Sequence, residues 1–122
     1  EKLPNWLRGC NSVNGYHPKH KELKVEKFVK KELVPLMSIK SLIEKYNIVS
    51  IDYLKIDTEG QDCKILKCLF KYVENRTLLQ PNKITFETNV LSTERDVKEI
   101  IQLYKKIGYK VISTGKDTTI AK

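Results

Sequence analysis

The sequence predicts an α/β fold in the order β-α-β-α-β-β, with a mainly parallel sheet that an antiparallel hairpin closes. Two observations support this class. Apolar runs of strand length alternate with longer segments whose apolar residues recur every three or four positions, the period of one helix face. Near the carboxyl terminus, strand-like runs at 109–113 and 118–121 flank a turn that contains Gly115, which predicts the hairpin.

The first third of the chain carries the weakest pattern. Residues 1–20 are rich in Pro, Gly, Asn and Ser and are typical of a structured loop. The apolar residues of 25–33 fit either a weak strand or a short helix, and the pattern does not choose between them. Ser38 is a good amino-terminal cap for a helix expected over 39–46.

The remaining elements carry stronger signals. In chain order we expect a strand over 51–57, a helix over 61–73, a strand over 83–88, and a helix that Ser92 or Thr93 caps and Gly108 ends. The first of these helices connects the two strands. The strands should therefore be parallel, with a right-handed crossover and with strand 51–57 in a central position.

Acidic residues follow both of the expected parallel strands. Asp57 ends the first strand and Glu59 and Gly60 follow it, while Glu87 and Asn89 come at the end of the second. In open α/β sheets, ligands bind in the crevice beyond the carboxyl ends of the strands. These residues are therefore candidates for a site. Simpler roles are open as well, because Asp57 could cap the helix that follows and Glu87 could be an ordinary loop acid.

The run Leu-Lys-Ile-Asp-Thr-Glu-Gly at 54–60 closely resembles the motif of the FkbM-type methyltransferases. Members of this family use S-adenosylmethionine to methylate hydroxyl groups of sugars and polyketides. Residues 3–12, with His17 five positions later, are similar to a family segment that reads Leu-Pro-x-Trp-x-Arg-Gly-x-Gly-Ser-Phe and then a histidine. Asn11 and Val13 depart from that segment. The run 86–89 is similar to the family's next strand and its acidic end.

The resemblance implies a role for each candidate residue. Asp57 or His17 would take the proton of the acceptor hydroxyl, with no metal required. Paired acids such as Asp57 and Glu87 could instead hold a divalent cation, which we do not favour. Residues expected to bind substrate or cofactor are Arg8, Ser12, Glu59, Gly60, Glu87 and Asn89.

A glycine-rich turn of the G-x-G type is missing after every expected strand. In a class I (Rossmann-like) methyltransferase, that turn holds the methionine part of the cofactor. We therefore expect this chain to be the carboxyl-terminal half of such a sheet. Residues 1–37 would form a loop-rich segment on the acceptor side, and 38–122 the half-sheet. Its partners would be the amino-terminal half of the same domain and a small-molecule or glycan acceptor.

Three functions fit the sequence: an S-adenosylmethionine-dependent O-methyltransferase, a methyltransferase-like module without catalysis, and a basic nucleic-acid-binding domain. The net charge is +8, but lysines supply nearly all of it and are mixed with acids. Aromatic and arginine interleaving, which base stacking uses, is lacking, so we do not expect nucleic acid as a partner. No stretch approaches the roughly 20 apolar residues of a membrane span. A cytoplasmic location is the default expectation.

Overall fold

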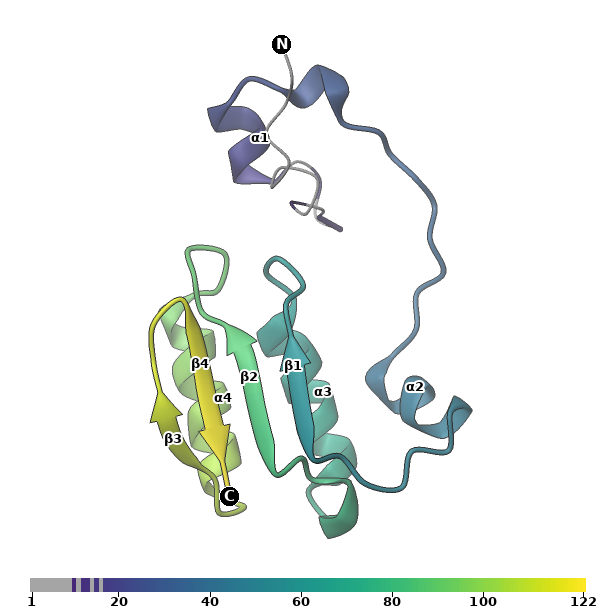
Figure 1. The fold of residues 1–122 in the computed structure, drawn as a ribbon, viewed down its shortest axis with the longest axis vertical. Helices are drawn as coiled ribbons and strands as arrows, with labels where there is room; N and C mark the ends of the chain where they lie inside the picture. Colours follow the sequence, from purple (N-terminus) through teal and green to yellow (C-terminus); the bar gives the residue numbers. More distant parts are fainter. Residues whose placement is uncertain (1–9, 11, 14, 16) are drawn as a thin grey trace. The chain divides into compact units, whose positions relative to one another are not determined.

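The computed structural model describes residues 10, 12, 13, 15 and 17–122. They belong to two compact units, Glu1–Pro35 and Leu36–Lys122, each of which is described by itself (Figure 1). The amino-terminal unit contains the short helix α1, Pro18–Glu22, and the 3-10 helix η2, Glu26–Phe28. A short helix, rather than a strand, therefore lies within 25–33.

The carboxyl-terminal unit is built on a four-stranded sheet in the order β1-β2-β4-β3. The strands are β1, Tyr53–Ile56; β2, Lys83–Glu87; β3, Lys110–Ser113; and β4, Asp117–Ala121. β1 and β2 are parallel, and β4 is antiparallel to both β2 and β3. The parallel pair and the closing hairpin are therefore confirmed.

Two details of the predicted sheet differ from the structure. The sheet is mixed, with one parallel and two antiparallel pairs, so a mainly parallel sheet is not confirmed. The reason is that β4 returns between β2 and β3 and reverses direction against both. The prediction that β1 is central is wrong for the part of the chain that the structure describes, because β1 lies at one edge of this sheet.

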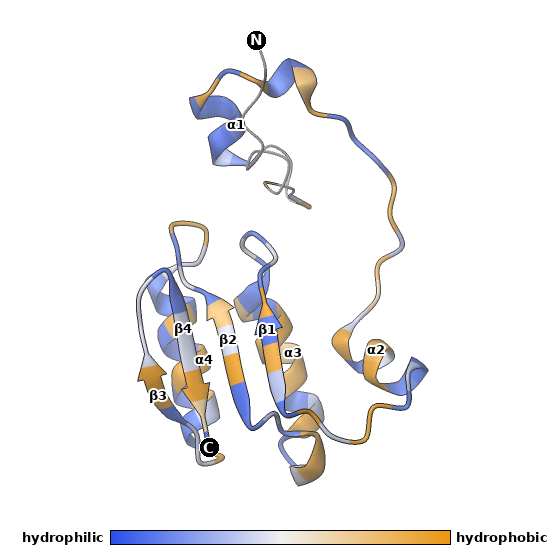
Figure 2. Cartoon of the chain, viewed as in Figure 1, coloured by the Kyte–Doolittle hydropathy of each residue, from blue (hydrophilic) through white to orange (hydrophobic). Residues whose placement is uncertain are grey.

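Two amphipathic helices cover one face of the sheet: α3, Asp62–Val73, and α4, Glu94–Lys105 (Figure 1). A third helix, α2, Ile39–Lys45, packs against α3, and a 3-10 turn, η3, Thr77–Leu79, follows α3. Both long helices carry hydrophobic and hydrophilic residues along their length, as expected for helices with one buried face (Figure 2). The core comprises Ile43, Ile56, Leu66, Leu69, Phe70, Val73, Ile84, Phe86, Ile100, Tyr104, Tyr109 and Ile120.

The helix ends follow the sequence signals. Ser38 Oγ accepts a hydrogen bond from the backbone N–H of Ser41 at 3.0 Å and caps α2. Of the two candidate caps for α4, the structure uses Thr93, whose Oγ1 accepts from the Asp96 N–H at 3.1 Å. Gly108 has φ +96° just after α4, the left-handed conformation that ends many helices. In the described part of the chain, no helix is long and apolar enough to cross a membrane.

Candidate functional site

The carboxyl ends of β1 and β2 lie at the same edge of the sheet (Figure 1). In the sheet, Lys55 of β1 pairs with Thr85 of β2. Two residues further along β2, Glu87 pairs with Asp117 of β4. Since Ile84 and Phe86 belong to the helix-covered core, Thr85 and Glu87 project from the opposite face. Asp57 lies two residues after Lys55, as Glu87 lies two residues after Thr85. The neighbouring strands β1, β2 and β4 therefore bring the carboxylates of Asp57, Glu87 and Asp117 to this edge.

A tight turn connects β1 to α3. Glu59 and Gly60 both have left-handed backbone conformations, with φ of +51° and +97°. For Glu59 this conformation costs about 1–2 kcal/mol, because its Cβ crowds the backbone. At Gly60 an added Cβ would also lie 3.3 Å from both Cβ and O of Leu91, in the loop after β2. Gly60 therefore lets the two loops of the site approach each other closely.

Asp62, at the first position of α3, links the two loops and was not among the residues predicted from the sequence. Its side chain is buried, with 0% exposure. Oδ1 accepts hydrogen bonds from the backbone N–H of Thr58 at 3.0 Å and from its hydroxyl at 2.5 Å. Oδ2 accepts from the backbone N–H of Glu87 at 2.8 Å. The only local signal is an acid in the first turn of a helix, which is too common to indicate this role.

Glu87 ends β2, and the pKa of its carboxyl is raised well above its ordinary value. This pKa is raised from 4.5 to about 7, mainly by burial and in addition by the nearby carboxylates of Glu59, Asp57, Asp62 and Asp117. Its Oε2 is buried and has no hydrogen-bond partner among the described residues. A carboxyl with such a pKa gains and loses its proton near neutral pH.

Asn89 fixes the other oxygen of Glu87. Its Nδ2 donates to Glu87 Oε1 at 2.5 Å, while its Oδ1 accepts from the Leu91 N–H at 2.8 Å. The Ser92 hydroxyl adds a hydrogen bond to the backbone carbonyl of Glu87 at 3.2 Å. The loop after β2 therefore holds both the side chain and the main chain of Glu87.

Asp57 is different in character, because its side chain is 57% exposed. It lies 4.0 Å from Lys55 Nζ. The alternative that Asp57 caps the following helix is wrong. The cap position of α3 belongs to Gln61, which makes no capping hydrogen bond with its side chain.

The remaining candidates belong to the amino-terminal unit. Arg8 lies outside the described residues. Ser12 is half-buried, and His17 is buried with 7% exposure. His17 Nδ1 accepts a hydrogen bond from the Lys19 N–H at 3.1 Å and caps α1. This nitrogen is therefore engaged in local structure, a role that the sequence pattern did not indicate.

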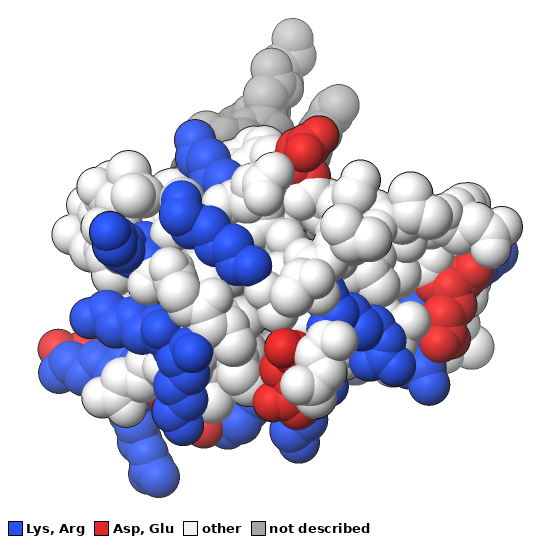
Figure 3. Space-filling view, turned by 90° about the horizontal axis from the view of Figure 1, so that it is seen from below, with Lys and Arg blue, Asp and Glu red and all other residues white. Residues whose placement is uncertain are grey.

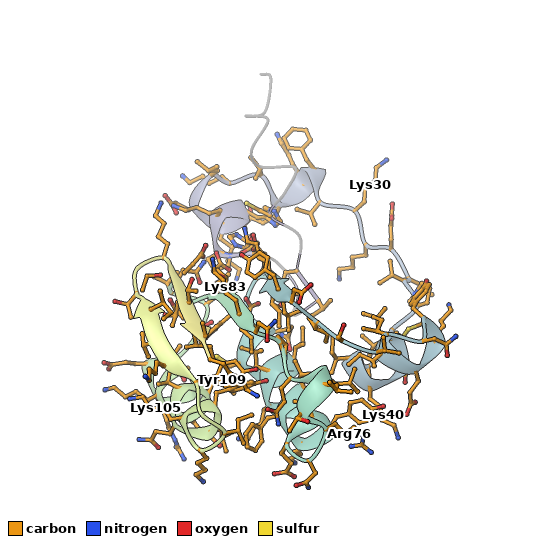
Figure 4. The ribbon with its side chains drawn as sticks, turned by 60° about the horizontal axis from the view of Figure 1, so that its bottom comes forward. Lys30, Lys40, Arg76, Lys83, Lys105 and Tyr109 are labelled. Atoms are coloured by element: carbon orange, nitrogen blue, oxygen red, sulfur yellow. The ribbon has the colours of Figure 1, made fainter. Side chains whose placement is uncertain are left out.

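Lysines occupy the opposite edge of the sheet. Lys83 begins β2, Lys110 begins β3 and Lys122 follows β4, which places all three away from the carboxylates. Lys and Arg side chains gather on the face seen from below (Figure 3). Two cations lie over one aromatic ring: Arg76 Cζ and Lys40 Nζ are 4.4 and 5.9 Å from the centroid of the Tyr72 ring (Figure 4). Lys83, Lys110 and Lys122 therefore lie at the opposite ends of the strands from the candidate site.

Comparison with known proteins gives one match. The family model of the methyltransferase FkbM domain matches residues 9–111, which include β1, α3, β2, α4 and the turn with Gly60. No curated protein and no solved structure matches the chain. Because the family match spans most of the 122 residues, the chain belongs to the FkbM methyltransferase family.

Proposed function

We propose that this protein is an S-adenosylmethionine-dependent O-methyltransferase that acts on a hydroxyl group of a sugar, a related small molecule or a glycan. The observation that carries the proposal is the convergence of Asp57, Glu59 and Glu87 on the carboxyl edge of β1 and β2 in a chain of this family. That edge is where open α/β sheets bind their ligands.

The charge of this edge suits the cofactor. S-adenosylmethionine carries a positive sulfonium and, when bound, supplies a methyl group that is already activated for transfer. A cation gains Coulomb energy near the carboxylates of Asp57, Glu59, Glu87 and Asp117. The same carboxylates would repel a polyanion, which argues against nucleic acid at this site.

The chain's own residues would align the acceptor oxygen and remove its proton. We propose that a carboxylate of this edge removes the proton directly, in preference to a divalent cation held between Asp57 and Glu87. Asn89 and Gly60 support this edge through the contacts of their loops. Arg8, Ser12 and His17 are proposed, from the family resemblance, to contribute to the acceptor side.

A further partner is proposed at β1. In the described part of the chain, β1 pairs with a strand on one side only, at its edge shared with β2. The backbone groups of its other edge can pair with an additional strand. We propose that the amino-terminal half of the same domain supplies that strand and the glycine-rich turn of the cofactor pocket.

Methyl-labelled S-adenosylmethionine tests the function directly. We expect the native protein to transfer the label to hydroxyl groups in a panel of mono- and oligosaccharides, with release of S-adenosylhomocysteine. Binding of saccharides without transfer would favour a module that lacks catalysis. Calorimetry on the 122-residue chain alone should detect weak or no binding of S-adenosylmethionine, and micromolar binding there would overturn the half-domain proposal.

A further inference from the structure

We propose that Glu87, and not the motif residue Asp57, is the base that accepts the proton of the acceptor hydroxyl. This inference rests on the proposed O-methyl transfer and assigns its proton to one atom, Glu87 Oε2. The assignment follows from how the two carboxylates are held, which the sequence alone does not distinguish.

The two oxygens of the Glu87 side chain differ in their hydrogen bonding. Asn89 Nδ2 donates to Oε1, whereas Oε2 is buried and has no hydrogen-bond partner among the described residues. A buried carboxylate oxygen without a donor is costly to keep, because such groups are normally hydrogen-bonded. A substrate hydroxyl is a donor that would satisfy it.

The main chain of Glu87 is fixed as well. The Asp62 carboxylate accepts from the Glu87 N–H at 2.8 Å, and the Ser92 hydroxyl donates to the Glu87 carbonyl at 3.2 Å. A general base needs its proton-accepting atom within hydrogen-bond reach of the substrate, so a rigid support favours catalysis. Glu87 has this support from the start of α3 and from the loop after β2.

The side chain of Asp57 is neither buried nor held by a rigid support. Its side chain is 57% exposed, and its ion-pair partner is the flexible side chain of Lys55, 4.0 Å away. Exposed pairs of this kind restrain a side chain weakly. Asp57 therefore suits an electrostatic role at the mouth of the site better than proton removal.

The protonation equilibrium of Glu87 fits the same role. Its pKa is raised to about 7, first by burial and then by Glu59 in the turn, Asp57 after β1, Asp62 at the start of α3 and Asp117 at the start of β4. One of these acids, Asp57, forms an ion pair with the cation of Lys55. A base whose pKa lies near the working pH accepts a proton efficiently and returns it readily to water.

The step balances as follows. The acceptor oxygen forms a bond to the methyl carbon while the bond between carbon and sulfur breaks, and its electron pair stays on sulfur. The hydroxyl proton moves to Glu87 Oε2. The products are the methyl ether, S-adenosylhomocysteine and protonated Glu87, which then loses its proton to solvent.

The test compares Glu87→Gln with Asp57→Asn in the native protein, with methyl-labelled S-adenosylmethionine and the saccharide panel as probes. Melting curves of both variants first establish that they fold. Below pH 7 we expect the wild-type rate to rise about tenfold per pH unit and then to level off. Glu87→Gln should lose about 10²-fold or more and lose this pH dependence. Asp57→Asn should lose less than about tenfold and keep the same rise with pH, with its midpoint shifted to lower pH.

Each other outcome overturns a defined part of the proposal. An active Glu87→Gln with an inactive Asp57→Asn would move the base to Asp57 and leave the function intact. Loss of transfer with a chelator, and its recovery with Mg²⁺ or Mn²⁺, would replace the base by a metal. A wild-type protein that transfers no methyl group to any acceptor in the panel would overturn the O-methyltransferase function itself, and the base with it.

Discussion

The carboxylate of Asp62 accepts a hydrogen bond of 2.8 Å from the backbone N–H of Glu87 and so ties the start of α3 to the end of β2. The same carboxylate also holds the backbone and hydroxyl of Thr58 in the turn after β1. One buried side chain therefore sets the spacing of the two loops that carry the candidate site. Its contribution is to the geometry of the site, since both of its oxygens are occupied by protein donors.

Asp62→Ala should destabilise the fold by about 2–4 kcal/mol, because it leaves the Glu87 N–H and the Thr58 donors without their acceptor. Asp62→Asn should cost less, about 1–2 kcal/mol, since its oxygen can still accept from Thr58 while its amide group faces the Glu87 donor. Chemical denaturation monitored by circular dichroism measures both. Glu74→Ala, an exposed acid at the end of α3, is the matched control and should change stability by less than about 0.5 kcal/mol. Equal stability of Asp62→Ala and this control would show that the three hydrogen bonds contribute nothing.

Comparing the stabilities of Gly60→Ala and Gly108→Ala separates the cost of backbone strain from the cost of a steric clash between the new Cβ and its neighbours. The two glycines have nearly the same φ, +97° and +96°, but a Cβ at Gly108 meets nothing within 4 Å while one at Gly60 meets Leu91 at 3.3 Å. Both variants should lose about 1 kcal/mol to the left-handed conformation. Gly60→Ala should lose roughly a further 1 kcal/mol or more, because Leu91 or the turn must shift. Equal losses in denaturation experiments would mean that the two loops do not constrain each other.

Much of the carboxyl-terminal unit could be predicted from the sequence. The three- and four-residue spacing of Leu66, Leu69 and Val73 predicts α3, and all three are fully buried in its core. A helix between two strands predicts that they are parallel, and this rule alone brings Asp57 and Glu87 to the same edge. The caps at Ser38 and Thr93 follow from their hydroxyl groups.

The rest depends on contacts between residues far apart in the chain. A hairpin pattern does not reveal which of its two strands lies beside β2, so the position of β4, and of Asp117 next to Glu87, could not be predicted. The role of Asp62 depends on a hydrogen bond to a residue 25 positions away. Ser92 and Thr93 were equivalent as caps in the sequence, and only the fold assigns the Ser92 hydroxyl to the Glu87 carbonyl.

Asp57→Asn tests the electrostatic role of the motif acid. The substitution removes one of the charges that raise the pKa of Glu87, so that pKa should fall below its wild-type value of about 7. Carboxyl-detected NMR titration, with Glu87→Gln to assign the resonance, measures the shift. Stability should change by about 0.5 kcal/mol or less, since Asp57 is exposed and caps no helix. A loss of about 1 kcal/mol in Asp57→Ala that Asp57→Asn does not share would instead restore the capping role.

Glu87→Gln should stabilise the fold at high pH more than at low pH. The folded pKa of about 7 lies above the ordinary value of 4.5, so between these values the folded state binds more protons than the unfolded state. The contribution of Glu87 to the free energy of unfolding therefore falls as the pH rises from about 4.5 to 7. Above pH 7 the folded state bears the full cost of keeping this carboxylate charged. The glutamine variant removes that cost but keeps an oxygen for Asn89 Nδ2.

Melting temperatures of the wild type and Glu87→Gln, taken from pH 4 to 8, give this difference directly. The pH-dependent contributions of all other titrating groups to stability cancel in this difference, apart from those of the acids that face Glu87. We expect the gain of the variant to be small near pH 4 and to grow until about pH 7, where it levels off. Glu87→Asp is the matched control, because it keeps the charge and should not show this growing gain. A difference between wild type and Glu87→Gln that is constant over the whole range would mean that Glu87 titrates as an ordinary exposed acid, and it would remove the basis for assigning it the proton.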